Sequence, residues 1–219
     1  MTKLVDRIKQ TARLIIEVPS IGIASLAYSS ATYACSLKAG LLDIGDPWWI
    51  LTVGLVLLLS PLYHAFAIGR VSSSALGQPF SLRKIPIESF GDLVVGELLV
   101  NGAVVLGSML FLLPGIYVGL RSIYYKQIIV LHKARTIAAV RQSFRETGDP
   151  QATFQMFAFL AAAYCIPLTI DYLLAPAVEA VWVHPVAILV SALFIAWVNV
   201  YITLSFTELA GREGAPEEN

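Results

Sequence analysis

The sequence contains little charge for its length. Only 14% of its 219 residues are charged, and 15 basic residues balance 15 acidic ones, so the formal net charge is zero. Soluble domains usually have about 25% charged residues, and nucleic-acid-binding domains carry a surplus of basic ones. The low and balanced charge therefore argues against a soluble protein and predicts no nucleic-acid partner.

Cysteine is scarce, and the sequence has none of the familiar catalytic motifs. Cys35 and Cys165 both fall in apolar runs, where cysteine is more often a small packing residue than half of a disulfide or a metal ligand. The three histidines are widely separated, and no phosphate-binding loop or dinucleotide fingerprint is present. We therefore expect no metal and no cofactor, and we expect that the protein is not an enzyme.

Apolar residues, by contrast, are abundant and gathered into long runs. They make up 57% of the chain, and the mean hydropathy is +0.74. Runs of about 20 apolar residues are typical of membrane-spanning helices. We therefore predict an all-α, polytopic membrane protein with six transmembrane helices. The predicted spans are residues 20–41, 48–69, 91–113, 115–132, 152–174 and 185–208.

The charges between the spans predict the orientation. In loops 42–47 and 175–184, which lie on the same side of the membrane, the charged residues are all acidic. Lys38 is the one cation near that side. Because cytoplasmic loops are rich in lysine and arginine, the opposite, basic side and both termini are expected in the cytoplasm. The basic residues of that side are Lys3, Arg7, Lys9, Arg13, Arg70, Arg83, Lys84, Lys133, Arg135, Arg141 and Arg145.

A Pro-Gly pair interrupts the apolar run between residues 91 and 132. Proline pushes the residue before it away from helical geometry, and glycine accepts the geometry of a turn. We therefore predict a tight hairpin turn at Pro114 and Gly115, on the outer side, between the third and fourth spans.

Two segments have the periodicity of amphipathic helices that lie at a membrane surface. They are residues 1–17 and 133–146, and residues 80–90 form a poorer third copy. A two-span hairpin follows each of them, which suggests three units of interfacial helix plus hairpin. Basic helices of this kind are attracted to anionic lipids, although cytoplasmic loops are also basic through topology alone. The predicted organisation is a single membrane domain over residues 1–219, with the interfacial helix 1–17, the six-span bundle 18–209 and a short polar tail 210–219.

Small residues recur at every fourth position of the first predicted span and form a ridge along one helix face. Such ridges let membrane helices approach one another closely. The ridge serves either packing within the bundle, which we favour, or an oligomer interface. Its members are Ala27, Ala31, Cys35 and Ala39.

Ionisable side chains inside the predicted spans form a candidate polar network. An unpaired charge in a membrane helix costs on the order of 2.5–3.5 kcal/mol on insertion scales, so each one is expected to have a partner. Arg121 and Asp171 lie at similar depths, which predicts either that pair or bonds from Arg121 to backbone carbonyls. Lys126 is deeper, and its candidate partners are Glu97 and Asn101. Three tyrosines are placed to stack on Arg121 or to bond to it, namely Tyr117, Tyr124 and Tyr125.

The central part of the sequence resembles a known bacterial family. Two segments carry this resemblance: "ALGQPFSLRKI" and "LLPGIYVGLRSIYYKQIIVLHKARTIAAVRQSFRETGD". The first contains the G-x-P-x-S-L loop of that family. The second contains its Pro-Gly-Ile break, followed by an arginine and by a basic helix with Ala139 and Ser143. Over residues 66–149 the chain is similar to the membrane domain of glycerophosphoryl diester phosphodiesterases and to related small membrane proteins. The resemblance implies a six-helix fold and a link with phospholipid metabolism or the envelope. It implies no catalytic residues, because the chain is too short to hold the soluble phosphodiesterase barrel.

We therefore expect a non-enzymatic, multi-pass protein of the bacterial inner membrane. It would act as a lipid-facing scaffold or as an accessory subunit of a membrane complex. Its expected partners are membrane lipids, other membrane subunits or further copies of the chain. The alternative is a small transporter or channel with a polar pathway through Arg121 and Lys126. An intramembrane enzyme would need a cluster such as His64 meeting Glu97.

Overall fold

The computed structural model describes residues 2–40, 47–80, 87–148, 153–154, 156–158, 161, 169 and 183–213. In this part of the chain all regular secondary structure is helical, as the apolar runs predict. The helices are α1 (Thr2–Glu17), α2 (Pro19–Gly40), α3 (Pro47–Ala75), α4 (Ile87–Leu110), α5 (Leu112–Arg121), α6 (Tyr125–His132), α7 (Thr136–Glu146) and α9 (Val183–Glu213).

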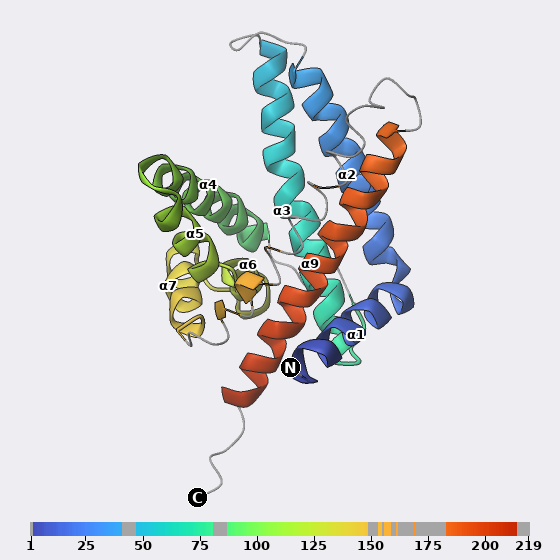
Figure 1. Cartoon of the computed structure of the whole chain (residues 1–219), viewed down its shortest axis with the longest axis vertical. Helices are drawn as coiled ribbons and strands as arrows, with labels where there is room; N and C mark the ends of the chain where they lie inside the picture. Colours follow the sequence, from blue (N-terminus) through green and yellow to red (C-terminus); the bar gives the residue numbers. More distant parts are fainter. Residues whose placement is uncertain are drawn as a thin grey trace, which may run out of the picture.

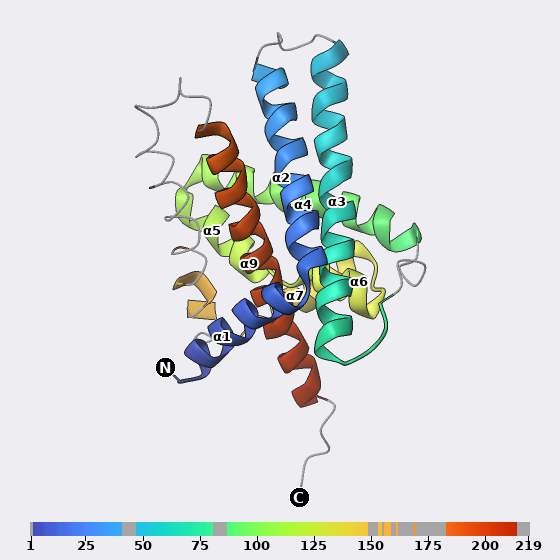
Figure 2. The same ribbon diagram turned by 90° about the vertical axis from the view of Figure 1, so that its right-hand side faces the viewer.

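Helices α2, α3 and α9 run side by side and form the long bundle of the molecule (Figure 1). Helix α4 lies across this bundle, and α5 folds back on α4 (Figure 2). Helices α6 and α7 fill the corner between α3, α4 and α9. Both termini and the end of α3 lie at one end of the bundle, whereas the start of α3 and the start of α9 lie at the other.

Helix α1 is a separate helix that lies across the end of the bundle, bent by 85° from α2. It packs on the last turns of α9. Arg7 donates to the carboxylate of Glu208 at 2.6 Å and to the hydroxyl of Ser205 at 3.0 Å. The sequence expectation of a distinct helix over residues 1–17 is therefore confirmed, and α9 supplies its partner.

Within the described residues, fewer helices qualify as membrane spans than the six predicted. Pro47–Ala75, Ser89–Leu110 and His184–Leu209 are long and apolar enough to cross a membrane, and the bent pair of α1 and α2 makes a fourth if it is counted as one span. Predicted span 152–174 falls almost wholly outside the described residues.

The predicted span 115–132 is divided into α5 and α6, which corrects the expectation of one continuous helix. The break follows Arg121, whose carbonyl oxygen accepts hydrogen bonds from the hydroxyls of Ser143 at 2.9 Å and Thr147 at 3.1 Å. The amide of Tyr124 donates to the hydroxyl of Ser143 at 3.0 Å. Side chains of α7 thus satisfy the backbone groups that a continuous helix would have paired, which makes the break stable.

The turn between α4 and α5 lies at Phe111 rather than at the predicted Pro114 and Gly115. Phe111 has an extended backbone, with φ −157° and ψ 141°, and α5 begins directly after it. Pro114 sits in the first turn of α5, where the amide that proline lacks has no helical partner anyway. The prediction found the right hairpin but placed its turn three residues too late.

Gly115 has a packing role instead of a turn role. A Cβ atom there would overlap the hydroxyl of Ser108 and lie 2.7 Å from the carbonyl oxygen of Val104. On the facing helix, a Cβ at Gly107 would lie 2.9 Å from the amide nitrogen of Gly115. The two glycines therefore let the backbones of α4 and α5 touch.

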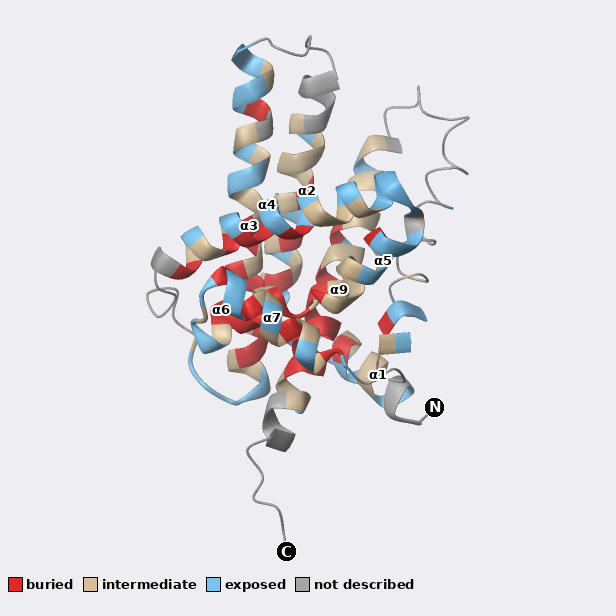
Figure 3. Cartoon of the chain, turned by 90° about the vertical axis from the view of Figure 1, so that its left-hand side faces the viewer, coloured by how far each residue is buried: buried red, intermediate tan, exposed pale blue. Residues whose placement is uncertain are grey.

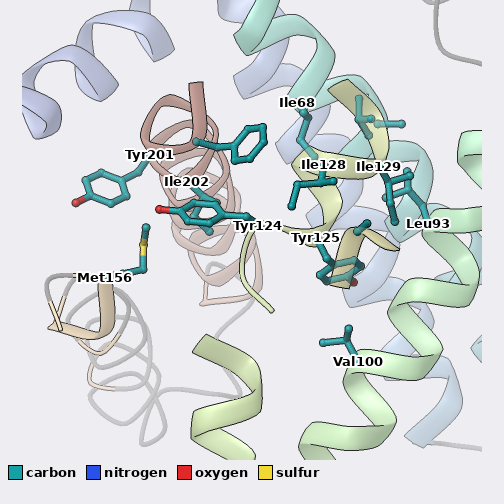
Figure 4. Packing of buried hydrophobic residues seen from close by; sticks show 14 residues of the cluster. Ile68, Leu93, Val100, Tyr124, Tyr125, Ile128, Ile129, Met156, Tyr201 and Ile202 are labelled. Carbon is teal, nitrogen blue, oxygen red and sulfur yellow. The ribbon is translucent and has the colours of Figure 1, made fainter. Parts of the chain in front are cut away.

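The main core is built around α6 (Figure 4). Ile128 and Ile129 are fully buried, and Tyr124 and Tyr125 are 5% and 4% exposed. They pack against residues of α3, α4 and α9, and Tyr201 of α9 lies in the same cluster. Helix α6 is therefore the centre of the protein rather than a lipid-facing span.

Apolar side chains are exposed along the outer faces of α3, α4, α5 and α9 (Figure 3). On α3 they follow helical spacing. Soluble proteins rarely expose apolar patches beyond a few hundred Å², so this belt fits contact with lipid. Its members include Trp48, Leu51, Leu55, Leu58, Leu62, Val95, Leu98, Leu106, Met109, Leu110, Phe111, Leu113, Leu189 and Leu193.

Candidate functional site

The structure pairs Lys126 with Glu97, one of the two partners that the sequence offers for it. Lys126 projects from α6, and its ammonium nitrogen lies 2.7 Å from Oε1 of Glu97 on α4. The side chain of Glu97 is 4% exposed and that of Lys126 is 20% exposed. In an ion pair this well buried, each charge has lost most of its hydration. Each one is therefore stabilised mainly by the other, and removing either would leave an uncompensated buried charge.

Two side chains of α3 complete this cluster. The hydroxyl of Ser60 donates to Oε1 of Glu97 at 2.8 Å. Nε2 of His64 lies 3.2 Å from the ammonium of Lys126, and its Nδ1 lies 2.7 Å from the carbonyl oxygen of Ser60. These partners fit a neutral imidazole with its hydrogen on Nδ1 and its Nε2 accepting from the ammonium.

Pro61 stands between these two α3 residues, in the interior of the helix. Proline has no amide hydrogen, so it removes the bond that would reach the carbonyl of Leu57. Polar side chains and neighbouring helices commonly surround such prolines in membrane helices. The polar cluster thus lies at the turn of α3 where Pro61 interrupts the backbone hydrogen bonds of the helix.

A second polar group continues from the cluster toward α2 and α9. The hydroxyl of Tyr63 lies 2.8 Å from the hydroxyl of Ser25 on α2 and accepts a bond from the amide of Asn199 on α9 at 3.4 Å. The ring of Tyr28 stacks on that of Tyr63, with centroids 4.6 Å apart. Hydrogen bonds between polar side chains thus connect all three long helices, α2, α3 and α9.

Arg121 belongs to a different part of the molecule from Lys126. Its guanidinium donates to the carbonyl oxygen of Thr147, just beyond the end of α7. It also lies 5.9 Å from the ring centroid of Tyr117 and 5.6 Å from that of Phe144. Of the two bonding modes predicted, the structure has the bond to a backbone carbonyl, and Asp171 lies outside the described residues.

Other predicted residues lie away from the partner that the sequence suggested for each of them, although the ring centroid of Tyr125 is 5.8 Å from the ammonium of Lys126. Asn101 is exposed on α4, and in the described part of the chain Lys126 bonds to Glu97 and His64 instead. Tyr124 and Tyr125 belong to the core rather than to the surroundings of Arg121.

The small-residue ridge of α2 faces outward at its start. Ala27 is exposed, Ala31 and Cys35 are half-buried, and the side chain of Ala39 is not among those described. The buried side of α2 is carried by Ile21, Ser25 and Ser29 instead. The ridge is thus not the most buried face of the described part of α2, and packing within the bundle and an oligomer interface both stay hypotheses for it.

Sequence reasoning did not connect Ser60 or Ser143 with the candidate residues. A usable signal existed for the first, because Ser60 and His64 are one helical turn apart and flank a proline. The family resemblance places Ser143 in one pattern with the preceding arginine, but it does not indicate the bond from its hydroxyl to the carbonyl oxygen of Arg121, 22 residues earlier.

In the described part of the chain no group of three or more His, Cys, Asp or Glu side chains is placed to hold a metal ion. No family model matches the chain, and no curated protein or solved structure matches it either. The function must therefore be argued from the clusters and the surface alone.

Proposed function

We propose that the protein is a non-enzymatic, multi-pass protein of the bacterial inner membrane that serves as a lipid-facing scaffold or as an accessory subunit of a membrane complex. The apolar belt on α3, α4, α5 and α9 supports membrane residence. The observation that carries the scaffold role is that both internal cations bond to groups of the chain itself. Lys126 is paired with Glu97, and Arg121 is bonded to a backbone carbonyl.

The six-span arrangement is the finer part of this proposal. Its spans are α2, α3, α4, the broken pair α5 and α6, residues 152–174, and α9, with both termini in the cytoplasm. It is supported by the charge pattern of the sequence, in which the basic residues of α1, of the end of α3 and of α7 all fall on the side expected in the cytoplasm.

Cysteine labelling tests this arrangement. Single cysteines at Asp46 and Arg141, in a chain with Cys35 and Cys165 replaced by serine, should react with an impermeant maleimide from opposite sides of the membrane. Three crossings separate the two positions if α5 and α6 together cross, and two if they do not. Labelling of both positions from the same side would reject the six-span arrangement.

The second candidate function is transport, and one observation favours it. His64, Glu97 and Lys126 converge from three helices, and ionisable residues within membrane helices often mark ion or proton routes. Arg121 bonds to α7 rather than to these helices, so this alternative centres on Lys126 alone. The contact of His64 with Glu97 is also what an intramembrane enzyme would need, but Oε1 of Glu97 already accepts from Lys126 and Ser60.

A flux assay separates the scaffold from the transporter. The purified full chain is reconstituted in vesicles that contain a pH-sensitive dye, and proton and potassium gradients are imposed. A scaffold should leave the leak rate equal to that of protein-free vesicles. A protein-dependent flux that disappears in Lys126→Gln but persists in the surface variant Lys9→Gln would contradict the scaffold and establish the alternative.

A further inference from the structure

Four exposed cations lie on the segment that runs from the end of α6 to the last turn of α7, and we call this group the basic corner. Arg141 and Arg145 lie one turn apart on the outer face of α7. The opposite face of α7 is buried through Thr136, Ala139 and Ser143, which fixes the arginines toward the outside. The members of the basic corner are Lys133, Arg135, Arg141 and Arg145.

In the described part of the chain, two carboxylates near the basic corner bond to neighbouring polar groups and are directed inward. Asp92 accepts from the amide of Thr136 at 3.0 Å and from its hydroxyl at 2.8 Å, which caps the start of α7. Glu146 is 10% exposed and accepts from Gln142 at 3.4 Å, and Arg145 approaches it only to 4.0 Å. The outer face therefore presents four positive charges with little local compensation.

Most of the described cations of helix α1, the other basic amphipathic segment, have an acidic neighbour. Arg13 forms an ion pair with Glu17 of the same helix at 2.6 Å, and Arg7 forms one with Glu208 of α9 at 2.6 Å. Lys9 is exposed on the same helix as the exposed Asp6. The two segments look alike in sequence, but among their described side chains the positive charge of α7 is the less balanced.

Apolar side chains adjoin the basic corner. Ile137 lies one turn before Arg141 and is 69% exposed, and Tyr117 of the neighbouring α5 is 57% exposed. Helix α7 also lies toward the end of the bundle where α1 and the last turns of α9 lie (Figure 1). Exposed apolar groups beside exposed arginines suit the boundary between acyl chains and headgroups, whereas an acidic protein segment would not require them.

We propose that the basic corner is a binding site for the phosphate groups of anionic phospholipids, with Arg141 and Arg145 as its main ligands and Ile137 in contact with the acyl chain. The inference rests on the proposed membrane location. It specifies the scaffold role further: the lipids are anionic phospholipids, and Arg141 and Arg145 are the residues that select them.

The test compares two double variants that remove the same charge. The full chain is purified in mild detergent, and phosphatidylglycerol or phosphatidylcholine is titrated while bound lipid is counted by native mass spectrometry. Arg141→Gln/Arg145→Gln should weaken phosphatidylglycerol binding on the order of twentyfold, because each basic residue near an anionic surface contributes roughly fivefold. Lys9→Gln/Arg13→Gln on α1 should change it less than twofold. Phosphatidylcholine binding should stay the same in both.

The conservative variant Arg141→Lys/Arg145→Lys should retain most of the binding, and added salt should weaken phosphatidylglycerol binding to the unaltered protein. Equal losses in the α7 and α1 variants would overturn the proposal, because they would mean that only total charge matters. Unchanged binding in the α7 variant would also overturn it and would leave an acidic protein segment as the occupant. Selective binding together with solute flux would refute the scaffold role and preserve the lipid site.

Discussion

Replacing Lys126 by methionine should destabilise the protein by about 3–5 kcal/mol, the usual cost of removing one partner from a buried ion pair. Methionine fills much of the same space, so the loss reports the charge rather than a cavity. The carboxylate of Glu97 would retain the bond from Ser60 but would lose its cation at 2.7 Å. The measurement is the midpoint of unfolding of the purified protein in detergent as denaturant is added.

A double-mutant cycle isolates the pair. Lys126→Met combined with Glu97→Gln should recover a substantial part of the loss, because neither charge then remains buried alone. The matched control is Lys9→Met, the same replacement at an exposed position, which should stay within about 0.5 kcal/mol of the unaltered protein. Strictly additive losses in the cycle would show that Lys126 and Glu97 do not depend on each other.

The second large effect is expected at Gly115. Gly115→Ala should cost about 3 kcal/mol, at the upper end of the cost of overpacking. The new methyl group would meet backbone atoms of α4, with the carbonyl oxygen of Val104 at 2.7 Å and the amide nitrogen of Ser108 at 2.8 Å. Because these atoms belong to a helix, they cannot move unless α4 and α5 separate. Unfolding midpoints in detergent again provide the measurement.

Gly102 of α4 is the matched control, since a Cβ there has nothing within 4 Å. Gly102→Ala should stabilise the protein by up to about 1 kcal/mol, because alanine is the better helix former. Equal responses at the two positions would show that the close approach of α4 and α5 does not determine the stability of the hairpin.

The long apolar helices could be read from the sequence with good accuracy. Predicted spans 48–69, 91–113 and 185–208 correspond to α3, α4 and α9. The amphipathic periodicity of residues 133–146 likewise agrees with α7. In these segments the pattern of hydrophobic residues and the helical repeat decide the structure, and both are visible in a single sequence.

The role of α6 could not be read in the same way. Its sequence is as apolar as that of a lipid-facing span. Hydropathy measures the free energy of transferring a side chain out of water, and it does not distinguish a side chain packed against protein from one in contact with lipid. What sets α6 apart is the break after Arg121, which depends on the hydroxyls of Ser143 and Thr147 further along the chain. A pattern search confined to neighbouring residues cannot detect this dependence.

The candidate site shows the same division. The sequence offers Glu97 as one of two candidate partners for Lys126, beside Asn101, whereas the participation of His64 depends on the position of α3 beside α6. The predicted turn at Pro114 and Gly115 erred because both residues are found in turns, and only the contact with Ser108 reveals why glycine is needed.

The contact between α1 and α9 has a consequence for the order in which the protein is assembled. Arg7 and Glu208 are 201 residues apart in the sequence, so a nascent chain holds the first helix long before its acceptor has been translated. The helix can form early, but its guanidinium gains its carboxylate only after Glu208 has been added to the chain. Closure of this ion pair therefore marks a late step in biogenesis, at which the first and last helices of the described chain are joined.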